Sequence, residues 1–248
     1  MKFIFNNLII LLFSIIFYSC STDEKIIIQE NYNYNNCESN TAKYIPKYPL
    51  DRFKNEVEKY EVTDSKELQS KIIFYGSSTM RLWNPFLKKH FPNLPIIGHG
   101  FGGATFPELI KYNDRLVLKY NPKIVVLYCE NDQFVTPSKQ AQQVSDDFCE
   151  LIYKINENLQ DVKIVYIAMK HSKSRDYKWN EMQEADKYIK NLENTYHNFT
   201  FIDLNKFIQT NNQVIDESCF ESDNLHLNEK GYQKWADTLG TILEKMYY

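Results

Sequence analysis

Five short runs of apolar, β-branched and aromatic residues, separated by segments of helix length, most constrain how this chain can fold. Polar and apolar residues do not alternate within these runs, which is typical of strands buried on both faces of a parallel sheet. The runs are Lys71–Tyr75, Pro95–Ile97, Lys123–Tyr128, Val162–Ala168 and Phe199–Leu204. Amphipathic helical patterns precede, separate and follow them, at residues 51–61, 79–90, 105–119, 137–158, 179–195 and 228–246. This alternation predicts one three-layer α/β/α domain built on a five-stranded parallel sheet.

The composition limits the classes of function that the chain can serve. It has 248 residues, of which 43% are hydrophobic and 25% charged, as is ordinary for one globular domain. The net charge is −3, and no basic stripe is present that could neutralise phosphate groups. The sequence therefore argues against nucleic-acid binding, while it does not specify an oligomeric state.

The first residues are typical of an export signal. Lys2 is followed by the nearly apolar stretch Phe3–Phe17, then by Ser19, Cys20 and a polar run. A cysteine directly after such a stretch resembles the lipobox of bacterial lipoproteins, in which the thiol is lipidated and becomes the mature N-terminus. We therefore expect residues 1–20 to be a lipoprotein signal peptide with Cys20 as the lipidation site. A plain signal peptide or a signal anchor is the alternative.

The following segment predicts where the folded domain works. Residues 21–48 are rich in Asn, Tyr and Ser without an apolar period, which is typical of a flexible tether. The domain would then comprise residues 49–248. A lipid on Cys20 would make the membrane a partner and place the protein in the bacterial cell envelope. We expect an outer-membrane location, with the domain facing the periplasm or the cell surface.

The cysteines other than Cys20 do not predict a metal site. They are Cys37, Cys129, Cys149 and Cys219, and their spacing matches no metal-binding motif. Export would permit disulfides among them. The sequence does not decide between disulfides and free thiols.

Polar residues and glycines follow four of the predicted strands. Ser78 follows the first strand, Gly98–Gly103 the second, Asn131 the third, and Asp223 and His226 lie in a loop after the fifth. In open parallel sheets, sites form outside the carboxyl ends of the strands. We therefore expect these four segments to meet at one edge of the sheet.

The residue types at this edge suit acyl transfer. A serine such as Ser78 needs a base to take its proton, and a histidine such as His226 titrates in the right range. Asp223, three residues before His226, could hold the imidazole in one tautomer. Glycine-rich backbone near Gly103 and the side-chain amide of Asn131 could hold negative charge on a substrate oxygen.

Together these segments resemble the motif blocks of the SGNH hydrolases, also called GDSL-type lipases and esterases. The matching segments are Gly76-Ser77-Ser78, Gly100–Thr105, Cys129-Glu130-Asn131-Asp132 and Asp223–His226. The first resembles the Gly-Ser-Ser variant of one branch of the family, and Met169–Arg175 also resembles that branch. Three positions depart from the pattern: Cys129 replaces a glycine, and His171 and Lys173 replace prolines.

The resemblance implies a flavodoxin-like five-stranded sheet, no metal and no organic cofactor. It also implies hydrolysis of carboxylic esters through an acyl-enzyme, with Ser78 as nucleophile and Asp223 and His226 completing the catalytic set. Gly103 and Asn131 would form the oxyanion hole. Charged and aromatic residues around the motifs lead us to expect a short acyl group, such as acetyl, on a carbohydrate or other polar alcohol. The substrate would be a small-molecule or glycan ester.

Several other interpretations remain open from the sequence. An O-acyltransferase or a lysophospholipase could use the same residues, and a catalytically silent glycan-binding lipoprotein could retain the fold. Gly98, Gly100 and Gly103 also fit the dinucleotide-binding pattern G-x-G-x-x-G, although they follow the second strand instead of the first. A metal site made from His99, Asp223 and His226 is a further alternative, although no short-spaced ligand pair supports it.

Overall fold

The computed structural model describes residues 49–248, apart from residues 65–70, 136–137 and 213. The expected signal peptide and tether, with Cys20 and Cys37, lie outside the described residues. Within the described part of the chain, no helix is long and apolar enough to span a membrane.

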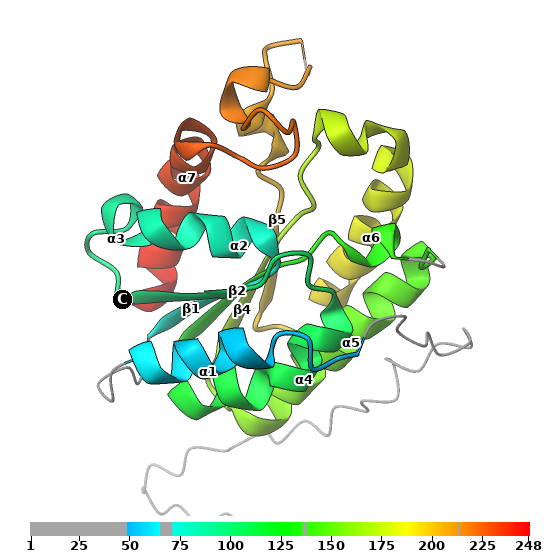
Figure 1. The fold of residues 1–248 in the computed structure, drawn as a ribbon. Helices are drawn as coiled ribbons and strands as arrows, with labels where there is room; N and C mark the ends of the chain where they lie inside the picture. Colours follow the sequence, from blue (N-terminus) through cyan, green and yellow to red (C-terminus); the bar gives the residue numbers. More distant parts are fainter. Residues whose placement is uncertain (1–48, 65–70, 136–137, 213) are drawn as a thin grey trace, which may run out of the picture. The chain divides into compact units, whose positions relative to one another are not determined.

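A single five-stranded sheet forms the centre of the domain (Figure 1), and all its neighbouring strands pair in parallel. The strands are β1 (Ile72–Gly76), β2 (Ile96–Gly100), β3 (Ile124–Tyr128), β4 (Lys163–Ile167) and β5 (Phe199–Ile202). Their order, β2-β1-β3-β4-β5, is the flavodoxin-like order. The predicted parallel α/β architecture is therefore confirmed.

Helices cover both faces of the sheet. Alternate strand residues point to opposite faces, and both sets are apolar, so each face has its own apolar cluster. One apolar cluster contains Ile73 and Tyr75 from β1 and packs against α1 (Lys54–Thr63), α4 (Phe106–Leu116), α5 (Ala141–Asn158) and α6 (Trp179–Asn191). The other contains Ile72 and Phe74 and packs against α2 (Ser78–Trp83), α3 (Leu87–His90) and α7 (Glu229–Tyr247). Figure 1 shows α7 beside α2 and α3, and α1 beside α4.

Two differences from the sequence-based prediction bear on the site, beside shifts at the ends of other elements. The second strand extends to Gly100, so that Gly98 to Gly100 pair with Phe74 to Gly76 of β1. Position 100 requires glycine, because a Cβ there would lie 2.1 Å from the backbone nitrogen of Arg81 in α2. The helix predicted over 79–90 is divided into α2, a 3-10 turn (Asn84–Phe86) and α3. Pro85 lies at that break, because proline has no N–H to continue the helical hydrogen bonds.

The strand order determines where a site can form. The chain leaves β1 for β2 on one side and continues to β3 on the other side of β1. Such a switch point leaves room between the loops at the carboxyl ends of β1 and β3. Ser78 follows β1 and Asn131 follows β3, so the candidate residues lie at this switch point.

Candidate active site

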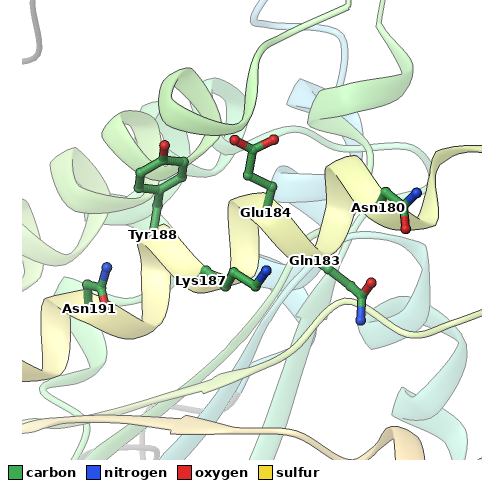
Figure 2. Close-up of a pocket in the computed structure, with 6 residues that line it drawn as sticks. All are labelled: Asn180, Gln183, Glu184, Lys187, Tyr188 and Asn191. Atoms are coloured by element: carbon green, nitrogen blue, oxygen red, sulfur yellow. The ribbon is translucent and has the colours of Figure 1, made fainter.

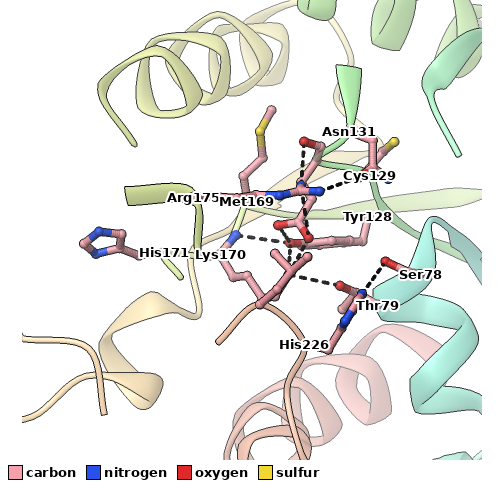
Figure 3. A network of polar contacts seen from close by, with 12 residues as sticks. Ser78, Thr79, Tyr128, Cys129, Asn131, Met169, Lys170, His171, Arg175 and His226 are labelled. Carbon is pink, nitrogen blue, oxygen red and sulfur yellow. Dashed lines mark hydrogen bonds and ion pairs between the residues drawn. The ribbon is translucent and has the colours of Figure 1, made fainter. Parts of the chain in front are cut away.

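Ser78 and His226 are joined by a hydrogen bond, although 148 residues separate them in the sequence. Ser78 is the first residue of α2, and its side-chain Oγ lies 2.9 Å from Nε2 of His226 (Figure 3). By contrast, the neighbouring Ser77 Oγ is buried and has no hydrogen-bond partner among the described residues. Of the two serines, Ser78 therefore meets the histidine.

Asp223 holds the other side of the imidazole. Its Oδ2 lies 2.6 Å from Nδ1 of His226, and its Oδ1 accepts the backbone N–H groups of Leu225 and His226. Although partial burial acts to raise the pKa of Asp223, these hydrogen bonds lower it to about 2. The carboxylate is thus ionised at neutral pH and can only accept. It holds the proton on Nδ1 and leaves Nε2 free to accept a proton from Ser78.

The loop before α7 fixes this pair. Asn224 has a φ of 55°, and the turn around it is closed by Asn224 N–H donating to Glu221 O. Glu221 N–H in turn donates to His226 O at 2.8 Å, and Phe220 and Leu227 form an antiparallel bridge. The Asp-x-x-His segment is therefore a tight turn directly before α7, as the sequence predicted.

Asn131 lies at the end of β3 with its side-chain amide held on both sides. Its Nδ2 donates to Ala104 O at 2.8 Å, and its Oδ1 accepts from Nη2 of Arg175 at 2.7 Å. The Nδ2 group carries two hydrogens, and the second has no acceptor among the described residues. One N–H of Asn131 is therefore available to a substrate.

Gly103 occupies the turn after β2 in the left-handed conformation, with a φ of 74°, which favours glycine. Its carbonyl accepts from Nη2 of Arg52 at 2.7 Å. Among the described residues, no acceptor takes the N–H of Gly103 or that of Ser78 at the start of α2. The N–H of Gly103 and the amide of Asn131 are the donors that the resemblance implied for an oxyanion hole, and the N–H of Ser78 is a third candidate donor.

The segment after β3 also anchors the loop that carries Gly103. The Asp132 carboxylate accepts the N–H of Phe106, the first residue of α4. The thiol of Cys129 donates to Ala104 O at 3.1 Å and is fully buried, and this burial raises its pKa. Cys129 therefore packs inside the domain, and its thiol helps to anchor the loop at Ala104.

Sequence reasoning missed a buried ionic network beneath the site (Figure 3). Lys170 and Glu130 form an ion pair in which both side chains are 0% exposed. The Lys170 Nζ also contacts the Tyr128 hydroxyl and Thr79 Oγ1, each at 3.3 Å. Burial acts to raise the pKa of Glu130, but Lys170 and Arg175 hold it below its usual range. Because Thr79 follows Ser78 and Glu130 precedes Asn131, this network joins the loops after β1 and β3.

The two ligand-binding alternatives from the sequence are not supported by the geometry. Both ring nitrogens of His99 already have protein partners, Leu116 O at 2.8 Å and Asp64 Oδ2 at 2.9 Å. In the part of the chain that the structure describes, no group of three His, Cys, Asp or Glu residues could hold a metal ion. Two glycines of the G-x-G-x-x-G pattern, Gly98 and Gly100, instead allow the segment from α2 to α3 to approach β2, because Cβ atoms there would clash with residues 80–87.

The polar face of α6 lines a hollow on the domain surface (Figure 2). Its residues are Asn180, Gln183, Glu184, Lys187, Tyr188 and Asn191. It contains none of the residues that the sequence predicted for the site. The candidate active site is therefore the edge of the sheet where Ser78, Asn131 and His226 meet.

Comparison with known proteins relates the chain to one sequence family. The model of the GDSL-like lipase/acylhydrolase family matches residues 71–234. This range includes Ser78, Gly103, Asn131, Asp223 and His226. Comparison with curated protein sequences gives no significant match.

Several solved structures share the fold. A GDSL-like lipase from Bacteroides thetaiotaomicron has a TM-score of 0.66 at 14% identity, with 79% of this chain and 99% of that chain covered. An acetyl-xylooligosaccharide esterase from Geobacillus stearmophilus has a TM-score of 0.55 at 13% identity, with 74% and 97% covered. An acetyl xylan esterase has a TM-score of 0.55 at 23% identity, with 70% and 99% covered. At these identities, the likeness concerns the fold.

Proposed function

The chain belongs to the GDSL-like lipase/acylhydrolase family and is therefore an ester-hydrolysing enzyme, and we propose that it works through an acyl-enzyme on Ser78. The observation that carries this proposal is the chain of two hydrogen bonds, 2.9 Å and 2.6 Å long, from Ser78 through His226 to Asp223. These are the contacts that nucleophile, base and orienting carboxylate need.

The first half of the reaction forms the acyl-enzyme. The Oγ of Ser78 attacks the ester carbonyl carbon while Nε2 of His226 takes the Oγ proton. The carbonyl oxygen becomes negative and accepts hydrogen bonds from the N–H groups of Ser78 and Gly103 and from the amide of Asn131. The carbon–oxygen bond to the alcohol then breaks, and the proton on Nε2 passes to the leaving alcohol.

The second half repeats these steps with water. His226 takes a proton from a water molecule, whose oxygen attacks the acyl carbon. Collapse of the second tetrahedral intermediate releases the carboxylic acid and returns the proton to Ser78 Oγ. Asp223 keeps its negative charge throughout and stabilises the imidazolium that forms in each half.

For the substrate, we propose a short acyl group on a carbohydrate or other polar alcohol. Charge at the site supports this: Arg81 is exposed, and its guanidinium lies beside Gly102, next to the proposed oxyanion hole. Two structures with the same fold carry names of esterases that act on acetylated xylan or xylooligosaccharide. We expect p-nitrophenyl acetate to be turned over faster than p-nitrophenyl laurate, and faster turnover of laurate would refute the short-acyl proposal.

For the location, we propose attachment to the outer membrane through a lipid on Cys20. The order of charge, apolar stretch and cysteine in residues 1–20 supports this. A disulfide at Cys149 also suits an exported protein. We expect a Cys20→Ser variant to leave the membrane fraction, and its retention there would contradict a lipid anchor.

The serine mechanism is tested by labelling the protein with a fluorophosphonate and mapping the modified residue. We expect Ser78 to be the labelled residue and expect Ser78→Ala and His226→Ala to abolish turnover with the fold retained. Ser77→Ala is the matched control, because Ser77 precedes the proposed nucleophile and its hydroxyl has no hydrogen-bond partner in the part of the chain that the structure describes. An inactive Ser77→Ala variant beside an active Ser78→Ala variant would overturn the assignment.

A further inference from the structure

Arg175 contacts three parts of the segment that follows β3. It belongs to a 3-10 helix, η5 (Lys173–Lys178), after β4. Its Nη2 donates to Oδ1 of Asn131 at 2.7 Å, and its Nη1 donates to Glu130 O at 3.1 Å. Its guanidinium carbon lies 4.0 Å from the ring centre of Phe134, which fixes the plane of the group. The side chain is therefore held in place before it meets Asn131.

The partners of Asn131 leave its amide only one orientation. A guanidinium can only donate hydrogen bonds, so Arg175 must face the oxygen of the carboxamide. The carbonyl of Ala104 can only accept, so it must face the nitrogen. A flipped amide would place donor against donor and acceptor against acceptor at these two contacts. The second N–H on Nδ2 is thereby aimed away from both partners.

We propose that Arg175 is a positioning residue for ester hydrolysis, because it fixes the Asn131 carboxamide in the orientation that donates to the substrate oxyanion. This inference rests on the proposed function of the site. Arg175 does not touch the reacting atoms in this arrangement and acts through Asn131. Its loss should therefore lower kcat, because the oxyanion bond is strongest in the transition state.

The position of Arg175 is itself secured from the other side of the site. Ser174, its neighbour, donates from Oγ to Asp223 O and from its backbone N–H to Asn224 O at 3.1 Å. The same short segment thus contacts the turn that holds His226 and the amide of Asn131. Without Arg175, this segment would lose its contact with Asn131 and keep its contacts with the turn of Asp223.

Replacement of Arg175 should not leave an unpaired buried charge. Glu130 is also close to the guanidinium, at 3.4 Å, but keeps its ion pair with Lys170 and its hydrogen bond from Tyr128 when Arg175 is absent. Arg175→Met preserves much of the length of the side chain that packs on Phe134 and removes the donors. The fold can therefore be tested separately, by thermal unfolding followed by circular dichroism.

A double-mutant cycle with Asn131→Ala separates this role from general destabilisation. With p-nitrophenyl acetate, Asn131→Ala should lower kcat by about 10²–10³-fold, as for other oxyanion donors. We expect Arg175→Met to lower kcat by at least about 10-fold with KM changed less than about 3-fold. In the Asn131→Ala background, Arg175→Met should change kcat by less than about 3-fold. Arg175→Lys, which keeps a donor to Oδ1, should recover part of the loss.

The matched control is Lys173→Gln, which removes a positive charge from the same 3-10 helix. Lys173 pairs with Glu217 in a contact where both side chains are 60% exposed, and it should be neutral in kcat. Equal losses from Arg175→Met in both backgrounds, or an unchanged kcat in the single variant, would overturn the inference. Fluorophosphonate labelling of the unmutated protein distinguishes the two proposals, because absence of label on Ser78 would refute the serine mechanism itself.

Discussion

Replacing Lys170 by methionine tests whether the buried ion pair holds the site together. In the folded protein, the side chains of Lys170 and Glu130 are both 0% exposed, and Lys170 also contacts Tyr128 and Thr79. Removal of one partner from a buried pair typically lowers stability by about 3–5 kcal/mol, because the other charge is left buried. Arg175, 3.4 Å from Glu130, would still neutralise part of that charge. We therefore expect Lys170→Met to lower the free energy of unfolding by about 3 kcal/mol, the lower end of that range.

Urea unfolding measures this change through tryptophan fluorescence, since Trp83 and Trp235 are both fully buried. A loss of about 3 kcal/mol corresponds to a Tm lowered by roughly 6–12 °C in a domain of this size. The double variant Lys170→Met/Glu130→Gln removes both charges and should recover about 2 kcal/mol relative to Lys170→Met alone. A loss below about 1 kcal/mol in the single variant, or no recovery in the double variant, would refute this account of the pair.

The pH dependence gives a second measurement of the same pair. In the unmutated protein the folded pKa of Glu130 lies below its ordinary value of 4.5, so its stabilising contribution is present above that pH and lost as the pH falls. Lys170→Met removes one of the two cations that offset the burial of the Glu130 carboxylate. The carboxylate of the folded variant should therefore bind a proton more readily than that of the unfolded chain. Stability of the variant should then rise as the pH falls toward 4.5. The difference between the two proteins should therefore be largest at neutral pH and shrink in acid.

Two further predictions concern the packing of α2, which begins at Ser78, and the proposed base His226. Gly100→Ala should destabilise the fold by about 3 kcal/mol or more, because its Cβ would lie 2.1 Å from the Arg81 backbone nitrogen. The control Gly102→Ala meets only the Arg81 side chain, at 3.6 Å, and should change stability by less than about 1 kcal/mol. Similar losses of the two variants in urea unfolding would contradict the packing argument. Asp223→Asn should lower kcat for p-nitrophenyl acetate by about 10⁴-fold, because the amide no longer holds the proton on Nδ1 of His226. A variant that keeps more than about a tenth of the original kcat would show that the 2.6 Å contact is dispensable.

Sequence reasoning found the strands and the order of the motifs because both are local patterns. Buried apolar runs predicted all five strands. Ser78 and Asn131 follow β1 and β3 as predicted, and Asp223 lies in the predicted loop between β5 and α7. The pattern failed at Gly98 to Gly100, which have no β-branched or large apolar residue and still pair with β1. There, close packing of α2 on β2 outweighs intrinsic strand preference.

The residues that orient the site could not be found in this way. Lys170, Glu130 and Arg175 are charged, and charged residues are almost always solvent-exposed unless they are paired. The Lys170–Glu130 contact joins positions 40 residues apart and the Arg175–Asn131 contact joins positions 44 residues apart, and both appear only when the segments after β3 and β4 meet. The resemblance of Met169–Arg175 to one branch of the family marked the segment, but it did not assign a contact to Arg175.

The two arginines near the proposed oxyanion donors use the same arrangement. Arg52 bridges Gly103 O and the carboxylate of Glu108, whose side chain is 3% exposed. Arg175 bridges Asn131 Oδ1 and the buried Glu130. Each guanidinium thus ties a group beside a free N–H donor to a carboxylate that packing holds in place. Oxyanion donors stabilise charge best when they need no reorganisation as that charge develops. The proposed donors here lie on loops, so tying them to buried carboxylates would hold them in the geometry that the reaction needs.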